Sequence, residues 1–427
     1  MTVELHQWGD NLANRDFRNK TNENWKRLES SYGILEKDSV NVQVDINHIK
    51  KQSEEAAKLS KNVQEQVNTL VIDGDSSPEA AQARTDVNGV THSTLKDRID
   101  SDSNKVNHLM YMLTHKLDFK GAAVTTFANT DYNYVFGRLK EINCNAQVVQ
   151  MCNVSSYTSD TVTIQPDAEL TKAILSATEK GVPIQLLKPH VGVNGSDGSN
   201  KTAIKPTNVS NWFNSYKPII MHYAEIAHNN NIPILSVGNE LSSLTGSENI
   251  QHWKDIIYSI RQLYPELILT YACTFNELVR MTNDKKTGKD AIMNYVDLIG
   301  GNIYPQMTTK DFDGVGNITV EELIEGIYLN HDNVMYVNAI TDACRLFSKD
   351  ILITETGIMP KIDSLKNFIA TGAYNTRTQS LYYQSVLSVL GSMHQVKGIF
   401  IWHIREPFDF FDGEGEVVIK EMFGEVL

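Results

Sequence analysis

The chain has 427 residues, 41% of them hydrophobic, which is enough for two or three domains and for a large apolar core. Its formal net charge is −13 and it has no long run of Lys and Arg, so nucleic acid and anionic membranes are not expected as partners, because both require a basic surface. The N-terminus is polar and no apolar run reaches about 18 residues. We therefore expect neither a secretion signal nor a membrane span, and a soluble chain made in a cytoplasm.

The first 116 residues are polar and contain few strand-like apolar runs. Within 36–72, small and apolar side chains follow a seven-residue repeat, which predicts a coiled-coil helix with a weak middle. The alternative is one amphipathic helix lying on a globular domain, but the all-polar opposite face favours self-association. The a and d positions of the repeat are Ile46, Ile49, Ser53, Ala56, Ser60, Val63, Val67 and Leu70.

A turn-rich insert at 73–95 interrupts this helical pattern, because Gly74, Pro78 and the Asn88-Gly89 pair all disfavour a continuous helix. A second helical segment is predicted at 96–116, leading directly into the next domain. Its apolar residues keep a spacing compatible with the heptad from Leu95 to Leu113, with Asp102 as the one polar exception.

This N-terminal part resembles the leading segments of tail-fibre and baseplate proteins from phages of Gram-positive bacteria. The resemblance is carried by WGDNLANRDFRNKTNENW at 8–25 and by SPEAAQARTDVNGVTHSTLKDRID at 77–100. It implies that residues 1–35 attach to the virion and that the coiled coil holds three copies together. Neither segment contains a chemical motif, so the resemblance indicates a context and not an activity.

From residue 117 to 427 the pattern changes to short apolar runs that alternate with amphipathic helices such as 212–231 and 376–395. Eight such units without a glycine-rich dinucleotide fingerprint predict an α/β fold of the closed (β/α)8 TIM-barrel type. The four cysteines are sparse and lack CxxC spacing, so we expect buried free thiols and no metal or disulfide. The candidate strands are 118–124, 146–153, 183–189, 232–239, 267–273, 297–304, 350–356 and 397–403.

Two of these runs end in a glutamate: IPILSVGNE closes on Glu240 and DILITETG contains Glu355. In an α/β barrel the C-terminal ends of the strands form the rim of the active site, so the two carboxylates are expected to meet there. A single strand-end glutamate is equally well explained as an ion-pair partner or a helix cap. Two carboxylates from separate strands indicate glycoside hydrolysis.

The barrel region resembles retaining (β/α)8 glycoside hydrolases of clan A, and among them the β-mannanase-like families. The motifs are LLKPHV (186–191), WFNSY (212–216), SVGNEL (236–241), NIYPQM (302–307) and ITETG (353–357). The resemblance implies that Glu240 is the acid/base and Glu355 the nucleophile. Mutual repulsion and burial would raise the pKa of one carboxyl, while hydrogen bonds keep the other ionised.

The same resemblance assigns three neighbours to the pair. Asn239 is expected to hydrogen-bond the substrate hydroxyl beside the anomeric carbon, and Tyr304 to contact the nucleophile. Trp402 is expected to support the apolar face of a sugar ring. The alternatives are a buried asparagine that satisfies loop backbone, an ordinary rim tyrosine, and a core tryptophan.

Four further substrate-binding candidates are Lys188, His190, Trp212 and His403. Lys188 and His190 are placed on the rim, where they would bind hydroxyls or an acidic substituent, although His190 also fits a satisfied loop histidine. Trp212 would form a wall of the cleft or anchor its helix, and His403, with Arg405 and Glu406, would line the site or be solvated. NGSDGSN at 194–200 lacks the spacing of a calcium loop and is expected to be a flexible loop, so no metal or cofactor is predicted.

The leading hypothesis is a phage tail-associated, endo-acting glycoside hydrolase that cleaves a cell-wall or capsular polysaccharide of the host with retention. It would be a homotrimer of the virion, assembled in the host cytoplasm and bound through its N-terminus to other tail proteins. Several copies on one particle would raise avidity for a surface glycan. The first rival is a receptor-binding protein whose barrel holds the glycan without cutting it, and the second is a purely structural tail component.

Overall fold

The computed structural model describes residues 117–197, 200–367 and 370–424, together with 25–26, 58, 61, 82–85, 94–96 and 98–99. The chain divides into two units, residues 1–113 and 114–427. The expected segments at 1–35, 36–72, 73–95 and 96–116 lie almost entirely outside the described residues, so they stay predictions. In the described part of the chain, no helix has both the length and the apolar character needed to cross a bilayer.

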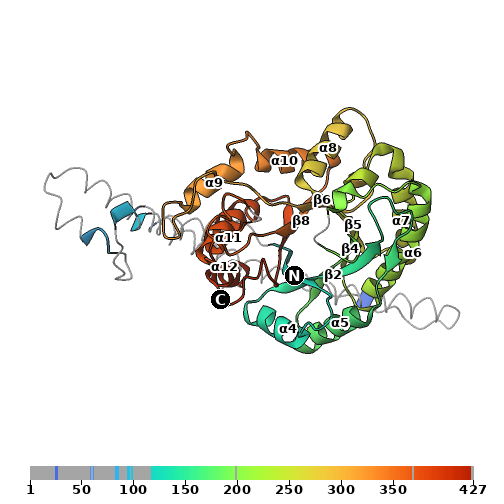
Figure 1. Cartoon of the computed structure of the whole chain (residues 1–427), viewed down its shortest axis with the longest axis horizontal. Coiled ribbons are helices and arrows are strands. Elements are labelled where there is room, and N and C mark those ends of the chain that lie inside the picture. Colours follow the sequence, from blue (N-terminus) through green and yellow to red (C-terminus); the bar gives the residue numbers. More distant parts are fainter. Residues whose placement is uncertain are drawn as a thin grey trace, which may run out of the picture. The chain divides into compact units, whose positions relative to one another are not determined.

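The second unit is a closed barrel of eight parallel strands, which confirms the predicted fold (Figure 1). The strands pair in the order β1-β9-β8-β7-β6-β5-β4-β2, and pairing of β1 with β2 closes the ring. The ninth strand, β3 (Thr163–Ile164), is a short antiparallel addition to the end of β2. The barrel strands are β1 (Phe119–Thr125), β2 (Asn145–Val154), β4 (Ile184–Val193), β5 (Ile234–Asn239), β6 (Ile268–Thr274), β7 (Leu298–Asn302), β8 (Ile351–Thr356) and β9 (Val396–Ile401).

Helices follow the strands and cover the outside of the barrel (Figure 1). This cover explains why the strands are nearly continuous apolar runs, since their outer faces are buried by helices and their inner faces by one another. The two helices expected around 212–231 and 376–395 are α6 and α11. The helices of this unit are α4 (Tyr132–Glu141), α5 (Ala168–Lys180), α6 (Val209–Asn229), α7 (Ile250–Leu263), α8 (Phe275–Lys286), α9 (Val320–Tyr328), α10 (Tyr336–Phe347), α11 (Arg377–Leu390) and α12 (Glu414–Phe423).

A fully buried apolar cluster lies inside the barrel and packs against Phe119, Ile268 and Leu298 at the starts of β1, β6 and β7. Leu186, Ile234, Leu352 and Phe400 form this cluster, and none of them has exposed surface. The polar side chains that follow these apolar residues along β4, β5 and β8 lie nearer the C-terminal ends of the strands. The topology therefore places the chemistry at one end of the barrel.

Strands β8 and β9 approach each other closely just beyond Glu355. The Trp402 N–H donates to the Thr356 carbonyl over 2.8 Å, and a Cβ at Gly357 would lie 1.9 Å from the Trp402 carbonyl oxygen. Only glycine permits this approach, which brings the Trp402 segment beside the Glu355 strand. The Trp402–His403 peptide bond is cis.

All four cysteines are free and buried, as expected for structural thiols. Burial raises the pKa of the Cys152 and Cys344 thiols to about 12. Because the thiolate is the reactive form, these side chains are unreactive at neutral pH.

Candidate active site

A cleft of about 690 Å³ opens at the C-terminal ends of the barrel strands. It is lined by six of the predicted site residues, namely His190, Glu240, Tyr304, Glu355, Trp402 and His403. Further lining residues that the sequence patterns did not single out include Asp197, Lys201 and Asn302. The cleft is therefore the one place where the two strand-end glutamates and most of their predicted neighbours meet.

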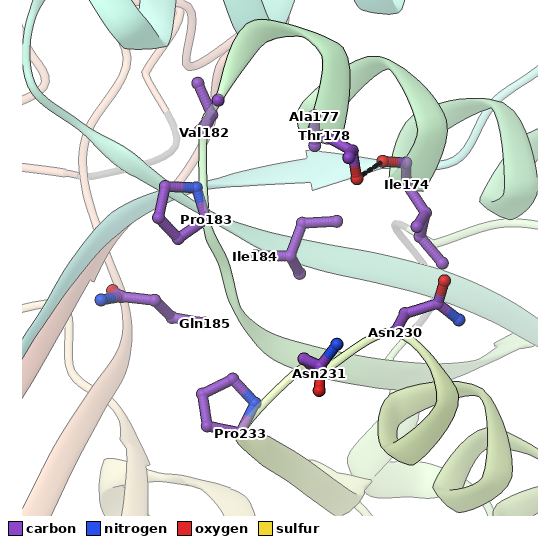
Figure 2. A pocket seen from close by; sticks show the side chains of 11 residues that line it. Ile174, Ala177, Thr178, Val182, Pro183, Ile184, Gln185, Asn230, Asn231 and Pro233 are labelled. Carbon is purple, nitrogen blue, oxygen red and sulfur yellow. Dashed lines mark hydrogen bonds between the residues drawn. The ribbon is translucent and has the colours of Figure 1, made fainter.

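A second hollow, of about 510 Å³, lies at the opposite end of the barrel strands (Figure 2). It is bounded by the C-terminal end of α5, the start of β4 and the segment before β5, and includes Pro183, Gln185, Asn231 and Pro233. None of its lining side chains titrates, so it offers no acid or base. The first cleft, which holds both predicted glutamates, is the candidate active site.

Glu355 lies near the end of β8 and is 6% exposed. Lys188 Nζ donates to its Oε1 over 2.5 Å, and the Tyr304 hydroxyl donates to its Oε2 over 2.7 Å. Burial and the charge of Glu355 raise the pKa of Tyr304 well above its ordinary value, so this phenol remains a donor. Each carboxylate oxygen thus has its own donor, and the contact expected for Tyr304 is present in the geometry.

Lys188 does not lie on the rim, contrary to our expectation. Its side chain has no exposed surface and lies within the barrel, where Nζ contacts Glu355 and donates to Asn302 Oδ1 over 3.1 Å. Burial lowers the pKa of the Lys188 ammonium, and the neighbouring Glu355 opposes this effect. A charge-assisted hydrogen bond of this kind orients the carboxylate strongly. Lys188 therefore acts on Glu355 and does not reach a ligand in the cleft.

Glu240 directly follows β5 and has a left-handed backbone with φ of 53°. This conformation is uncommon for residues other than glycine and is concentrated at functional sites. The Glu240 N–H donates to the Ala272 carbonyl over 2.8 Å, and Asn302 Nδ2 donates to Glu240 Oε1 over 2.9 Å. The side chain is half-buried and lines the cleft.

Asn302, at the end of β7, links the two glutamates. Its Nδ2 donates to Asn239 Oδ1 over 3.0 Å as well as to Glu240, while its Oδ1 accepts from Lys188 and, over 2.7 Å, from Thr354. The sequence patterns did not single out Asn302 as a site residue, although it begins the NIYPQM motif. Its position at a strand end was the only available signal.

Asn239 is 1% exposed and lies beneath Glu240 in this network. Its Oδ1 accepts from Asn302, whereas its Nδ2 has no hydrogen-bond partner among the residues that the structure describes. A buried amide donor without a partner costs free energy unless a ligand or water supplies an acceptor. Asn239 is not among the residues that line the cleft, so the expected contact with a substrate hydroxyl stays a prediction.

His190 lines the cleft, but it is 1% exposed and belongs to β4, so it lies neither on the rim nor in a loop as expected. Its ring stacks on Trp402 with centroids 5.7 Å apart and planes inclined by 15°, and its Nδ1 lies 2.8 Å from Asp197 Oδ1. Lys201 Nζ lies 3.0 Å from the same carboxylate oxygen. Burial alone would raise the pKa of Asp197, but His190 and Lys201 together hold it below its ordinary value.

The expectation of a simple flexible loop at 194–200 therefore misses Asp197, which anchors a buried ion cluster in the cleft. Lys201, only 6% exposed, keeps its charge there, because Asp197 and Glu240 raise its pKa against the effect of burial. Within the described ranges, no group of three or more His, Cys, Asp or Glu side chains is arranged to hold a metal ion.

His403 is buried in the wall of the cleft and its ring is held at both nitrogens. Nδ1 accepts from the Arg405 N–H over 3.0 Å, so the proton of the neutral ring lies on Nε2 and is donated to Thr125 Oγ1 over 2.8 Å. Burial lowers the pKa of His403 to about 3. His403 therefore holds the loop after β9 in place and lines the cleft through its buried ring.

The depressed pKa of His403 predicts acid sensitivity. The folded state keeps the His403 ring neutral, whereas the unfolded chain takes up a proton there below its pKa of about 6.5. The free energy of unfolding is therefore highest above pH 6.5 and decreases as pH falls toward 3. Between pH 7 and 4.5 this amounts to about 2–3 kcal/mol. His403→Asn should lower the thermal unfolding temperature at pH 7, but the unfolding temperature of the variant should fall less steeply between pH 7 and 4.5 than that of the wild type. An equally steep fall in the variant would contradict a buried, neutral His403.

Trp212 is not part of the cleft wall, contrary to our expectation. It has no exposed surface and packs on Phe213 and Tyr216 of its own helix, with ring centroids 5.1 and 4.6 Å away. It therefore belongs to the buried packing of α6 and not to the ligand space. Arg405 and Glu406 do line the cleft and are exposed, and the Arg405 guanidinium lies 4.8 Å from the centre of the Phe127 ring.

A (β/α)8 barrel whose strand ends bring two glutamates to one cleft has the arrangement of a two-carboxylate glycoside hydrolase. Residues 125–410 match the profile of Glycoside Hydrolase Family 113. The chain belongs to this family of retaining, β-mannanase-like enzymes. A comparison of the sequence with curated proteins finds no match.

Solved structures of the same family share the barrel. A GH113 β-1,4-mannanase is 18% identical with a TM-score of 0.56, and the match covers 72% of this chain and 99% of that one. The GH113 β-mannanase AaManA from Alicyclobacillus acidocaldarius, in complex with ManMIm, is 17% identical with a TM-score of 0.55, covering 73% and 98%. At these identities the likeness establishes the fold alone.

Proposed function

We propose that the protein hydrolyses a β-mannoside-containing polysaccharide with retention, using Glu355 as nucleophile and Glu240 as acid/base. The observation that carries this proposal is the unequal environment of two carboxylates in one network. Glu355 receives a lysine and a tyrosine donor, whereas Glu240 accepts one amide hydrogen bond and faces the cleft. The first arrangement suits a fixed, ionised nucleophile, and the second suits a group that must gain and lose a proton.

The proposed reaction has two steps. Glu355 attacks the anomeric carbon while the Glu240 carboxyl gives its proton to the glycosidic oxygen, so that the glycosidic bond breaks and a glycosyl ester forms. Glu240, now a carboxylate, then takes a proton from water, and the resulting hydroxide displaces Glu355 from the anomeric carbon. Asn239 would hold the adjacent hydroxyl, and the half-buried Trp402 ring would support the sugar.

The buried lysine gives this proposal a direct test. Lys188→Met should lower kcat/KM by about 10²-fold, because Glu355 loses its charged donor and keeps only Tyr304. Lys120→Met serves as the control, since Lys120 lies at the start of β1, at the opposite end of the barrel. Steady-state kinetics on a soluble mannan measure both variants. A Lys188→Met enzyme with wild-type kcat/KM would remove Lys188 from the mechanism.

The substrate in the biological setting is proposed to be a glycan of a host cell surface, in a cell wall or capsule. The support is the resemblance of residues 8–25 and 77–100 to phage tail and baseplate proteins, combined with a glycosidase barrel in the same chain. A trimer formed through 36–72 would place three clefts on one virion and raise avidity. Sedimentation of the full chain should give a trimer, and a monomer would refute the coiled coil.

The second candidate function is glycan binding without cleavage. Asn239 Nδ2, which is buried and has no hydrogen-bond partner in the described part of the chain, and the half-buried Trp402 ring would serve either function. Reducing-end release from β-1,4-mannan and from purified host wall or capsule distinguishes them, and proton NMR should show the β-anomer as the first product. Binding to these glycans without any released product would refute the hydrolase and favour the binding protein.

A further inference from the structure

A third glutamate, Glu277, lies close to the Glu240 segment but does not line the cleft. It belongs to the first turn of α8, where its N–H donates to Thr274 Oγ1 over 3.1 Å, and it is only 1% exposed. A carboxyl buried to this degree requires strong compensating contacts. Burial raises the pKa of Glu277 to about 7. Keeping this carboxyl buried therefore costs folding free energy.

The contacts of Glu277 lead directly to the segment that follows Glu240. The Tyr271 hydroxyl donates to Glu277 Oε1 over 3.0 Å, and the same hydroxyl accepts the N–H of Leu241 over 2.8 Å. Thr245 Oγ1 also donates to Glu277 Oε1. Both ends of the turn at 241–245 are therefore tied to one buried carboxyl.

Tyr271 also contacts the chain on the other side of Glu240. A Cβ at Gly238 would lie 3.0 Å from Cε2 of the Tyr271 ring, so the ring packs closely against the backbone of β5. One tyrosine thus restrains the residue two positions before Glu240 and the residue one position after it. Between these restraints Glu240 has its left-handed backbone, a conformation that persists only where the surroundings enforce it.

We propose that Tyr271 and Glu277 are positioning residues that hold the Glu240 carboxyl at the correct distance from the glycosidic oxygen without touching the substrate. The inference rests on the proposed acid/base role of Glu240. Proton transfer depends steeply on geometry, and a displacement of about 1 Å can reduce a rate by about 10²-fold. Glu277 acts through Tyr271 and through the backbone of Leu241.

A purely structural role would affect every substrate equally, whereas a role in positioning the acid would not. A 2,4-dinitrophenyl leaving group departs without a proton, but a phenyl leaving group needs one. We therefore compare kcat/KM, which reports the first step, for 2,4-dinitrophenyl and phenyl β-mannobiosides. Tyr271→Phe and Glu277→Leu should lower kcat/KM by about 10- to 100-fold for the phenyl glycoside and by less than about 3-fold for the dinitrophenyl glycoside.

Two control variants test whether the effect comes from loss of any buried tyrosine hydroxyl and whether Glu277 acts as a hydrogen-bond acceptor. Tyr216→Phe removes another buried tyrosine hydroxyl, which donates to Val237 of the same strand over 3.0 Å, and should stay within about 3-fold of wild type on both substrates. Glu277→Gln keeps an acceptor oxygen for Tyr271 and Thr245, so it should retain the phenyl-glycoside activity that Glu277→Leu loses. Thermal unfolding confirms that each variant is folded.

Equal losses on both substrates, or no loss on either, would overturn the positioning role while wild-type hydrolysis upheld the proposed function. A fully folded wild-type enzyme that cleaves neither glycoside would overturn the proposed function and the inference with it. Selective loss in Tyr271→Phe and Glu277→Leu, with recovery in Glu277→Gln, supports the assignment.

Discussion

Glu355→Gln should lower hydrolysis of β-1,4-mannan on the order of 10⁴-fold or more, because an amide cannot form the glycosyl ester. The variant loses the negative charge that Lys188 contacts over 2.5 Å, but Gln preserves the shape of the side chain. Substrate binding should therefore remain measurable by calorimetry while turnover disappears. Reducing-end release over hours, with intact protein checked by thermal unfolding, gives the measurement.

Glu179→Gln is a suitable control, since Glu179 is an exposed glutamate on α5 outside the cleft. It should be indistinguishable from wild type. If Glu355→Gln kept more than about a tenth of the wild-type rate, Glu355 could not be the nucleophile, and the assignment of roles in the network would have to change.

Glu240→Ala should have a large effect that depends on the leaving group. Without a proton donor, kcat/KM for an unactivated β-mannoside should fall by about 10²- to 10⁴-fold, whereas a 2,4-dinitrophenyl glycoside should lose far less in this first step. Turnover of the activated substrate should then be limited by the second step, where the general base is missing. Sodium azide, which needs no base, should restore turnover and yield a β-glycosyl azide.

The matched control for this variant is Glu248→Ala, an exposed glutamate in the short helix at 247–249 that follows the Glu240 loop. Equal losses for activated and unactivated substrates in Glu240→Ala would contradict an acid/base role. A β-azide product in the Glu355 variant and an α-azide product in the Glu240 variant would show that the two roles are reversed.

The two variants also separate the enzyme from the binding protein. If the wild-type chain binds a glycan without releasing product and both substitutions weaken that binding, the carboxylates serve only as ligands for sugar hydroxyls. The family membership of residues 125–410 argues for the enzyme, and the network through Asn302 keeps both carboxylates in place.

The barrel and its two glutamates could be predicted because they depend on local patterns. Buried parallel strands appear as apolar runs, and a residue at the end of such a run must lie at the C-terminal rim once the barrel closes. The order of strands and the position of Glu240 and Glu355 followed from counting these runs, and all eight strands are present.

The predictions for Trp212 and Lys188 were wrong because the direction and the burial of a side chain decide its role, and neither can be read from the sequence pattern. Trp212 is the first aromatic residue of an amphipathic helix, and its spacing does not tell whether it faces the barrel or the cleft; it is fully buried. Lys188 is a charge in an apolar run, which usually means an exposed position. Its burial is tolerated because Glu355, distant by 167 residues in the chain, supplies the opposite charge.

The sequence by itself determined the fold class, the eight strands and the two carboxylates, because hydrophobic periodicity and strand ends are local properties of the chain. Only the tertiary structure decided which partners surround those carboxylates. Asn302 contacts Glu240, Lys188 contacts Glu355 and Tyr271 contacts Leu241, and these partners are 30 or more residues apart in the chain, so the contacts exist only after the barrel closes. Side-chain hydrogen bonds act over about 3 Å, and no pattern in the sequence encodes which distant atoms will approach that closely.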